Sequence, residues 1–139
     1  MKKLIVVSLL MAATLVVSTR AQAQVIVIAN PGVKATEISK ADLRDVFTGA
    51  ATSLSGSNVM PILLKAGGVH EEFLAAYIGK NDTAFRAGWR SLVFSGQASM
   101  PKSLDSEAAL VDYVVHNAGA IGYISKATPH EGVNVLTVR

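Results

Sequence analysis

The sequence predicts a single α/β domain in which a central mixed β-sheet is flanked by helices. Three observations lead to this prediction. Short apolar runs rich in β-branched residues alternate with longer segments whose apolar residues recur at helical spacing. Turn-forming Gly, Pro and Asn stand between many of these segments. No internal repeat or low-complexity linker interrupts residues 24–139, so we expect one core formed by packed layers.

The first 23 residues are predicted to be a secretory signal peptide. Lys2 and Lys3 precede an apolar stretch over residues 4–18, and the small residues Ala21 and Ala23 provide a cleavage site. The apolar stretch is shorter than the roughly 20 residues that a membrane-spanning helix needs. We therefore expect cleavage after Ala23 and a soluble periplasmic product with no stable membrane insertion. An uncleaved N-terminal anchor is the alternative.

Charge and cysteine content argue against several function classes. Three of the 13 Lys and Arg residues lie in the predicted signal peptide, whereas all 10 Asp and Glu residues follow it. The mature chain is therefore formally neutral, which argues against nucleic-acid binding because that function requires a basic surface. The sequence contains no cysteine, so disulfides, thiol catalysis and cysteine-bound metals are excluded.

The first predicted strand is followed by a helix with recognisable ends. Residues 24–30 form a β-branched apolar run that stops at a Pro-Gly turn, which indicates a buried strand. Ser39 is suited to cap the next helix, and Asp42 occupies the third helical position in a capping-box arrangement. Gly49 is expected to end this helix.

A second strand and helix are predicted after a polar loop over residues 51–58. The strand, residues 59–65, contains Pro61, which lacks a backbone donor and favours an edge position or the start of a strand. The helix runs from about residue 69 to 78, where Gly79 stops it.

The next helix is predicted to begin at Asn81 or Asp82. Its apolar residues occur at i, i+4, i+7 and i+8, which indicates one buried face. These residues are Phe85, Trp89, Leu92 and Val93. We therefore expect Trp89 to pack in the core and not to serve as a platform for a ligand.

The last part of the chain is predicted to contain one helix and two strands. An irregular loop over residues 95–103 precedes the helix, residues 105–116, whose acidic first turn suits the positive end of a helix dipole. Residues 120–125 and 133–138 are apolar runs that indicate strands.

No pattern in the sequence indicates catalysis, a metal site or a bound cofactor. The G-x-S-x-G, H-E-x-x-H and P-loop motifs are absent. His70, His116 and His130 lie far apart in the sequence, and Leu74 stands where a second zinc-binding histidine would follow His70. We therefore expect a protein that is not an enzyme.

The segment from Lys65 to His70 is the strongest candidate for a functional site. Lys65 and the adjacent Gly67 and Gly68 stand where the predicted strand meets the predicted helix. Glycine lets a backbone approach an anion closely, and the N–H groups at a helix start attract negative charge. The candidate anion-binding residues are Lys65, Gly67, Gly68, Val69 and His70. The alternative is that the glycines only form a turn that requires a positive φ.

Four stretches, in order, resemble phosphate-binding proteins of ABC-type uptake systems, in the type II periplasmic-binding-protein superfamily. The stretches are "VIVIANPGV", "ISKADLRDVFTGAATSL", "LKAGGVHEEF" and "AGAIGYIS". The second is similar to the family's L-x-x-I-F-x-G-x-x-x-x-W segment, matched by Leu43, Val46, Phe47 and Gly49, with Leu54 in place of Trp. The third occupies the place of the family's R-x-D-G-S-G-T anion loop. The resemblance implies a three-layer-like lobe of that fold.

The resemblance also implies a non-catalytic solute-binding protein for phosphate or a similar small anion. An ABC permease or another periplasmic protein would be its partner. Lys65 and Gly68 stand for the Arg and the first Gly of the family's anion loop, but the loop's Ser and Thr hydroxyls are missing. Gly67, Val69, His70 and Glu71 stand in place of the family's Asp, Ser, Gly and Thr, in that order.

The mature chain corresponds to about one lobe of proteins that close two lobes around their ligand. The expectation is therefore weak anion binding, unless a second chain completes the cleft. A periplasmic protein-interaction module that kept the lobe fold and lost its ligand is the alternative.

Overall fold

The computed structural model describes residues 24–139, and the predicted signal peptide lies outside the described residues. The strands are β1 (Val25–Ala29), β2 (Glu37–Ile38), β3 (Ser53–Leu54), β4 (Ser57–Asn58), β5 (Met60–Leu64), β6 (Lys102–Leu104), β7 (Ala120–Ser125) and β8 (Asn134–Val138). The helices are α1 (Lys40–Thr48), α2 (Gly68–Phe73), α3 (Asp82–Phe94) and α4 (Glu107–His116). A π-helical segment, η1 (Leu74–Ile78), continues α2.

A six-stranded mixed sheet organises the domain, with the strand order β2-β8-β1-β7-β5-β6. Strand β1 runs antiparallel to both of its neighbours, β7 and β8. Strand β5 runs parallel to β7 on one side and to β6 on the other. Strands β3 and β4 form a separate two-stranded ribbon. The predicted mixed sheet is confirmed.

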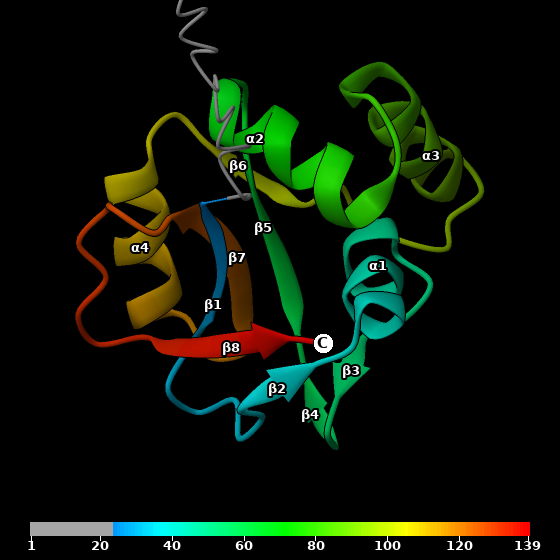
Figure 1. Cartoon of the computed structure of the whole chain (residues 1–139). Helices are drawn as coiled ribbons and strands as arrows, with labels where there is room; N and C mark the ends of the chain where they lie inside the picture. Colours follow the sequence, from blue (N-terminus) through cyan, green and yellow to red (C-terminus); the bar gives the residue numbers. More distant parts are fainter. Residues whose placement is uncertain (1–23) are drawn as a thin grey trace, which may run out of the picture.

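Helices cover both faces of this sheet, so the domain has three layers (Figure 1). Alternation along β7 shows the two faces, because neighbouring side chains of a strand point in opposite directions. Gly122 faces α4, and a Cβ on this residue would lie 2.7 Å from a methyl group of Leu110. The glycine therefore lets α4 approach the sheet closely. Tyr123 faces the opposite layer, where it contacts α1 and α2.

Three aromatic rings form the centre of the core on the face covered by α1 and α2. Tyr123 stacks on Phe73 with 3.9 Å between ring centroids. Phe47 meets the edge of Phe73 at 4.9 Å and that of Tyr123 at 5.8 Å. All three residues are fully buried. Such aromatic pairs stabilise a fold beyond the area that they bury.

The predicted starts of α1 and α3 are confirmed, and α4 begins at Glu107, two residues after its predicted start. Each of these three helices has a local capping residue. The Ser39 hydroxyl accepts from the Asp42 amide at 3.1 Å. The Asn81 side chain accepts from the third helical residue of α3, and the Ser106 hydroxyl does the same for α4. Each bond satisfies a donor that the helix itself leaves unpaired.

The predicted loops contain short strands that hydrophobic patterning did not indicate. Residues 51–58 hold β3 and β4, and residues 95–103 contain most of β6. These strands are only two or three residues long, and they form because a partner strand offers hydrogen bonds. Strand β5 is internal to the sheet, so of the two placements predicted for Pro61, an edge strand or a strand start, the structure shows the second. Pro61 lies near the strand start, before the pairing with β6 begins at Ile62.

The third predicted helix has the expected buried face, with one exception. Phe85 and Trp89 are buried and Leu92 packs partly against the core, but Val93 is 41% exposed. At 3.6 residues per turn, Val93 points about 80° away from Phe85 and lies at the margin of the apolar stripe. The next residue, Phe94, is 97% exposed.

Trp89 anchors α3 against α1, because it is buried and its Nε1–H donates to the Phe47 carbonyl at 2.9 Å. We expect Trp89→Ala to lower the free energy of unfolding by about 3–5 kcal/mol, the usual range for a large buried aromatic. Urea unfolding followed by circular dichroism measures this change.

The matched control is Phe94→Ala on the same helix, because that ring is almost fully exposed. Its effect on the free energy of unfolding should stay within about 0.5 kcal/mol. Equal effects of the two substitutions would contradict the assigned packing of α3.

Candidate functional site

The turn between β5 and α2 has an open backbone. Gly67 has a φ of 109°, a conformation that side-chain-bearing residues rarely adopt. A Cβ placed on Gly67 or Gly68 would meet nothing within 4 Å. The glycine at 67 therefore follows from the backbone conformation, and the turn leaves free space beside both glycines.

This turn borders a hollow of about 260 Å³ between the starts of α2 and α4. The residues that line it come from both sides: Leu64, Ala66, Gly67, Gly68, Val69, Asp105, Ser106 and Glu107. The chain places two helix starts at one hollow because β5 and β6 are parallel neighbours, so their carboxyl ends meet at the same edge. Such an edge is where ligands bind in many open α/β sheets.

Lys65 brings positive charge to this hollow, but its ammonium group is already paired with the carboxylate of Asp105. Its Nζ lies 3.0 Å from the Asp105 Oδ1, and the two side chains are 57% and 84% exposed. An exposed pair of this kind contributes little to stability. The predicted counter-charge for an anion is therefore present, but in this structure it is paired with a residue that sequence reasoning did not single out.

Glu107 adds a second carboxylate at the border of the hollow. Its Oε1 accepts from the Ser125 amide and from the Thr128 hydroxyl, the latter at 2.9 Å. These bonds direct the carboxylate toward the end of β7. Because Asp105 and Glu107 are both acidic, the hollow is less attractive to an anion than Lys65 alone would make it.

The structure brings together four of the five predicted site residues. Lys65 stands beside the hollow, and Gly67, Gly68 and Val69 line it. The ring of His70 points into the protein, where it is only 1% exposed. Its Nδ1 contacts the Tyr123 hydroxyl and its Nε2 lies 2.7 Å from Asp82 Oδ1.

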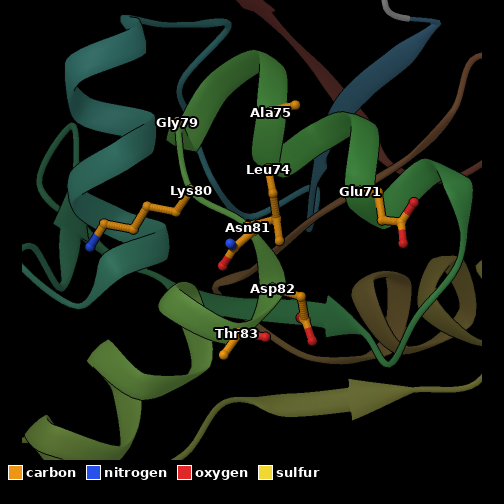
Figure 2. Close-up of a pocket in the computed structure, with 8 residues that line it drawn as sticks. All are labelled: Glu71, Leu74, Ala75, Gly79, Lys80, Asn81, Asp82 and Thr83. Atoms are coloured by element: carbon orange, nitrogen blue, oxygen red, sulfur yellow. The ribbon is translucent and has the colours of Figure 1, made fainter.

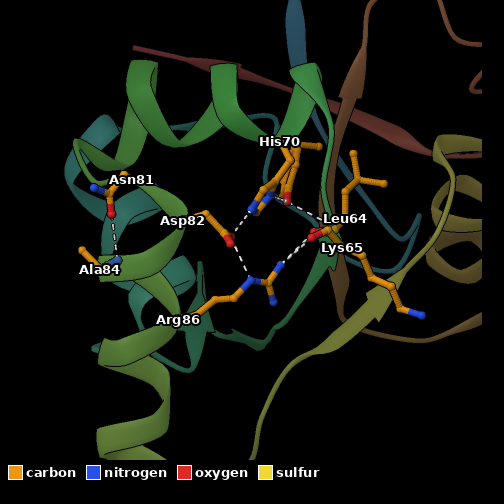
Figure 3. Close-up of polar contacts among 8 residues, drawn as sticks. Leu64, Lys65, His70, Asn81, Asp82, Ala84 and Arg86 are labelled. Carbon is orange, nitrogen blue, oxygen red and sulfur yellow. Dashed lines mark hydrogen bonds and ion pairs between the residues drawn. The ribbon is translucent and has the colours of Figure 1, made fainter.

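His70 belongs to a hydrogen-bonded network that extends behind the turn (Figure 3). The Nε of Arg86 donates to Asp82 Oδ1 at 2.8 Å. A terminal nitrogen of Arg86 donates to the Lys65 carbonyl at 2.9 Å and, at 3.4 Å, to the Leu64 carbonyl. Sequence reasoning missed this network, although the i, i+4 spacing of Asp82 and Arg86 on a helix was a signal for their ion pair.

The hydrogen positions in the network follow from its donors. The Leu64 amide can only donate, so the Tyr123 hydroxyl accepts this bond at 3.0 Å. The phenolic hydrogen is then free to donate to His70 Nδ1, and the imidazole carries its own hydrogen on Nε2, which donates to Asp82. Burial raises the pKa of Tyr123 far above its usual 10.0, despite the opposing effect of the Leu64 amide. The phenol therefore keeps its proton.

Asp82 is the charged acceptor of this network. Burial alone raises the pKa of its carboxyl group, but hydrogen bonds from His70 and Arg86, with the positive charge of Arg86, outweigh that effect. The pKa of Asp82 therefore lies below its usual 3.8. Asp82 and Arg86 carry opposite charges, so the pair adds no net charge behind the turn.

A larger hollow of about 680 Å³ lies between η1 and the start of α3 (Figure 2). Its lining residues are Glu71, Leu74, Ala75, Gly79, Lys80, Asn81, Asp82 and Thr83. Figure 2 shows the Lys80 side chain pointing away from Glu71 and Asp82. Two of the three charged residues that line this hollow, Glu71 and Asp82, are acidic, so it is a poorer candidate for an anion than the turn at Lys65.

Residues 24–139 show no group of three or more His, Cys, Asp or Glu side chains placed to hold a metal ion. Within the same residues, no helix is both long and apolar enough to cross a membrane.

Solved phosphate-binding proteins share this fold. An ABC-type phosphate transport receptor from Vibrio cholerae superposes with a TM-score of 0.64 at 17% identity, covering 82% of this chain and 45% of the receptor. A Clostridium perfringens protein solved with bound phosphate gives 0.63 at 16% identity, covering 82% and 44%. PstS from Borrelia burgdorferi gives 0.59 at 19% identity, covering 83% and 47%.

These likenesses confirm the predicted resemblance at the level of the fold. The chain spans less than half the length of these proteins and matches about one lobe of them. No family model and no curated protein matches the sequence.

The lowered pKa of Asp82 predicts how stability depends on pH. A carboxyl group whose pKa is lower in the folded state stabilises the fold above its unfolded pKa, and this contribution is lost as pH falls through the folded pKa. Asp82→Asn should therefore be less stable than the wild type at neutral pH. The difference should shrink as the pH falls below 3.8.

Urea unfolding of both proteins between pH 3 and pH 7 measures the difference. Asp45→Asn is the matched control, because Asp45 is an exposed carboxylate on another helix. A difference for Asp82→Asn that stayed constant over this range would show that the network does not lower the pKa of Asp82.

Proposed function

We propose that residues 24–139 form a secreted, non-catalytic, solute-binding-like domain that binds phosphate or a similar small anion weakly. The binding surface is the turn from Lys65 to His70, with backbone groups near Gly67 and Gly68 as the donors. The observation that carries this proposal is the hollow beside the open glycine turn, with the ammonium group of Lys65 at its border. The shared fold of phosphate-binding proteins supports it.

Binding at this turn is expected to be weak for two reasons. Val69 and Glu71 stand where the phosphate-binding motif has Ser and Thr, so two hydroxyl donors to the anion are missing. An anion must also displace Asp105 from Lys65, and the neighbouring Glu107 repels it. We expect a dissociation constant on the order of 1 mM, which corresponds to about −4 kcal/mol.

Phosphate titration with NMR detection of backbone amides tests the site. In the wild type, shifts should centre on residues 65–71, and Lys65→Ala should abolish them because the attracting charge is lost. Asp105→Asn should bind phosphate about two- to fivefold more tightly, because Lys65 then has no competing carboxylate.

Lys34→Ala and Asp45→Asn are the matched controls, since both residues are exposed and lie outside the residues that line the hollow. Sodium chloride keeps the ionic strength constant, because exposed charges are screened over about 10 Å at 0.1 M salt. Absence of shifts at residues 65–71 up to tens of millimolar phosphate, in the wild type and in Asp105→Asn, would refute anion binding.

The second candidate function is a periplasmic protein-interaction module that kept the lobe fold without a ligand. Two observations favour it: Lys65 is already paired with Asp105, and the ring of Phe94 is almost fully exposed at the end of α3. A negative titration would make this candidate the better account. In either case we propose that an ABC permease or another periplasmic protein is the partner.

Secretion is tested by the mass of the mature protein. The chain purified from a periplasmic fraction should begin at Gln24, because the cleavage site is predicted after Ala23. Intact-mass spectrometry distinguishes this product from the full-length chain. A full-length species that dominates in the membrane fraction would support the uncleaved anchor.

A further inference from the structure

The side chains of the glycine turn, residues 66–68, do not fix its conformation. Gly67 caps α2 without a side-chain hydrogen bond, and Ala66, Gly67 and Gly68 are exposed. Glycine also loses more conformational freedom on folding than any other residue. The position of the turn must therefore be fixed by contacts that precede and follow it.

Five residues behind the turn form a closed ring of hydrogen bonds. The Leu64 amide donates to Tyr123, whose hydroxyl donates to His70. His70 donates to Asp82, which also accepts from Arg86. Arg86 completes the ring with a long bond of 3.4 Å to the Leu64 carbonyl. Both backbone polar groups of Leu64 are thus held by side chains.

Arg86 extends this ring to the residue that carries the positive charge of the site. The terminal nitrogen that reaches Leu64 also donates to the Lys65 carbonyl at 2.9 Å. The Lys65 amide donates to the Leu104 carbonyl at 3.0 Å. The backbone of Lys65 is therefore fixed on both sides, which leaves its side chain and the following glycines to face the hollow.

We infer that Arg86 is a positioning residue for the anion-binding turn, acting through the hydrogen-bonded ring with Asp82, His70 and Tyr123. The planar guanidinium group spans a carboxylate and two backbone carbonyls at once, which the single ammonium group of a lysine does not do. Asp82 balances its charge, so the ring orders the turn without repelling or attracting the ligand. The consequence for anion affinity rests on the proposed function, but the ordering of the turn does not.

Arg86→Lys tests the inference because it keeps the charge and removes the planar group. Amide hydrogen exchange is measured in the ligand-free protein. The Lys65 amide and the Glu71 amide, which donates to the Gly67 carbonyl, report on the two sides of the turn. Their exchange should accelerate by about tenfold or more, as expected when hydrogen bonds from a charged group are lost. Amides of the internal strand β1 should keep their wild-type rates.

Arg90→Lys is the matched control, because Arg90 is an exposed residue one turn further along the same helix. Tyr123→Phe is the second variant. It removes the hydroxyl that joins Leu64 to His70 while it keeps the ring that stacks on Phe73. It should accelerate exchange at the same two amides, whereas Arg90→Lys should leave them unchanged.

Phosphate titration of the same proteins then links the ring to binding. Arg86→Lys should weaken phosphate binding by about tenfold or more, for the same reason. If the wild type binds no phosphate but the exchange result holds, the proposed function fails and the role of Arg86 in ordering the turn stands. Unchanged exchange in both ring variants, or acceleration that is equal in β1 and in the turn, would overturn the inference.

Discussion

The hydrogen bond from the Leu64 amide to the Tyr123 hydroxyl joins the aromatic core to the turn that follows β5. The same tyrosine stacks on Phe73, which lies on the helix that begins just after the turn. Both sides of the turn are thus positioned by one side chain of β7. Burial keeps the phenol protonated, and its hydrogen maintains the bond to His70. The open glycine backbone can remain exposed because Leu64 before it and His70 after it are hydrogen-bonded to the buried Tyr123.

The electrostatics at the surface explain why binding at this turn should be weak. The exposed ammonium group of Lys65 is balanced by Asp105, and Glu107 adds a further negative charge. In solvent such charges are screened, so affinity for an anion depends mainly on donors that are close to it and shielded from water. The part of the fold that this chain shares covers less than half of the solved phosphate-binding proteins. A second protein surface over the hollow would supply that shielding.

Sequence reasoning succeeded where structure is determined locally and failed where it depends on distant partners. Ser39, Asn81 and Ser106 each cap a helix through the residue three positions ahead, so the signal for such a cap lies within one short stretch of sequence. The short strands β2 and β6 form because distant segments offer hydrogen bonds, whereas β3 and β4 pair with each other across a tight turn. All four are too short for their sequences to show an alternating apolar pattern. The ion pair of Lys65 and Asp105 joins residues 40 positions apart, so local sequence patterns could not indicate it either.

The candidate site was partly predictable. The Lys-x-Gly-Gly pattern located the turn, but His70 was placed at the anion although it shares helical spacing with the buried Phe73 and Leu74. A crystal structure of residues 24–139 grown in concentrated phosphate is the most direct test. The account predicts an anion in the hollow, within hydrogen-bond distance of the Gly67–Gly68 backbone and of Lys65 Nζ, with Asp105 displaced. An intact Lys65–Asp105 pair and no anion at the turn would contradict it.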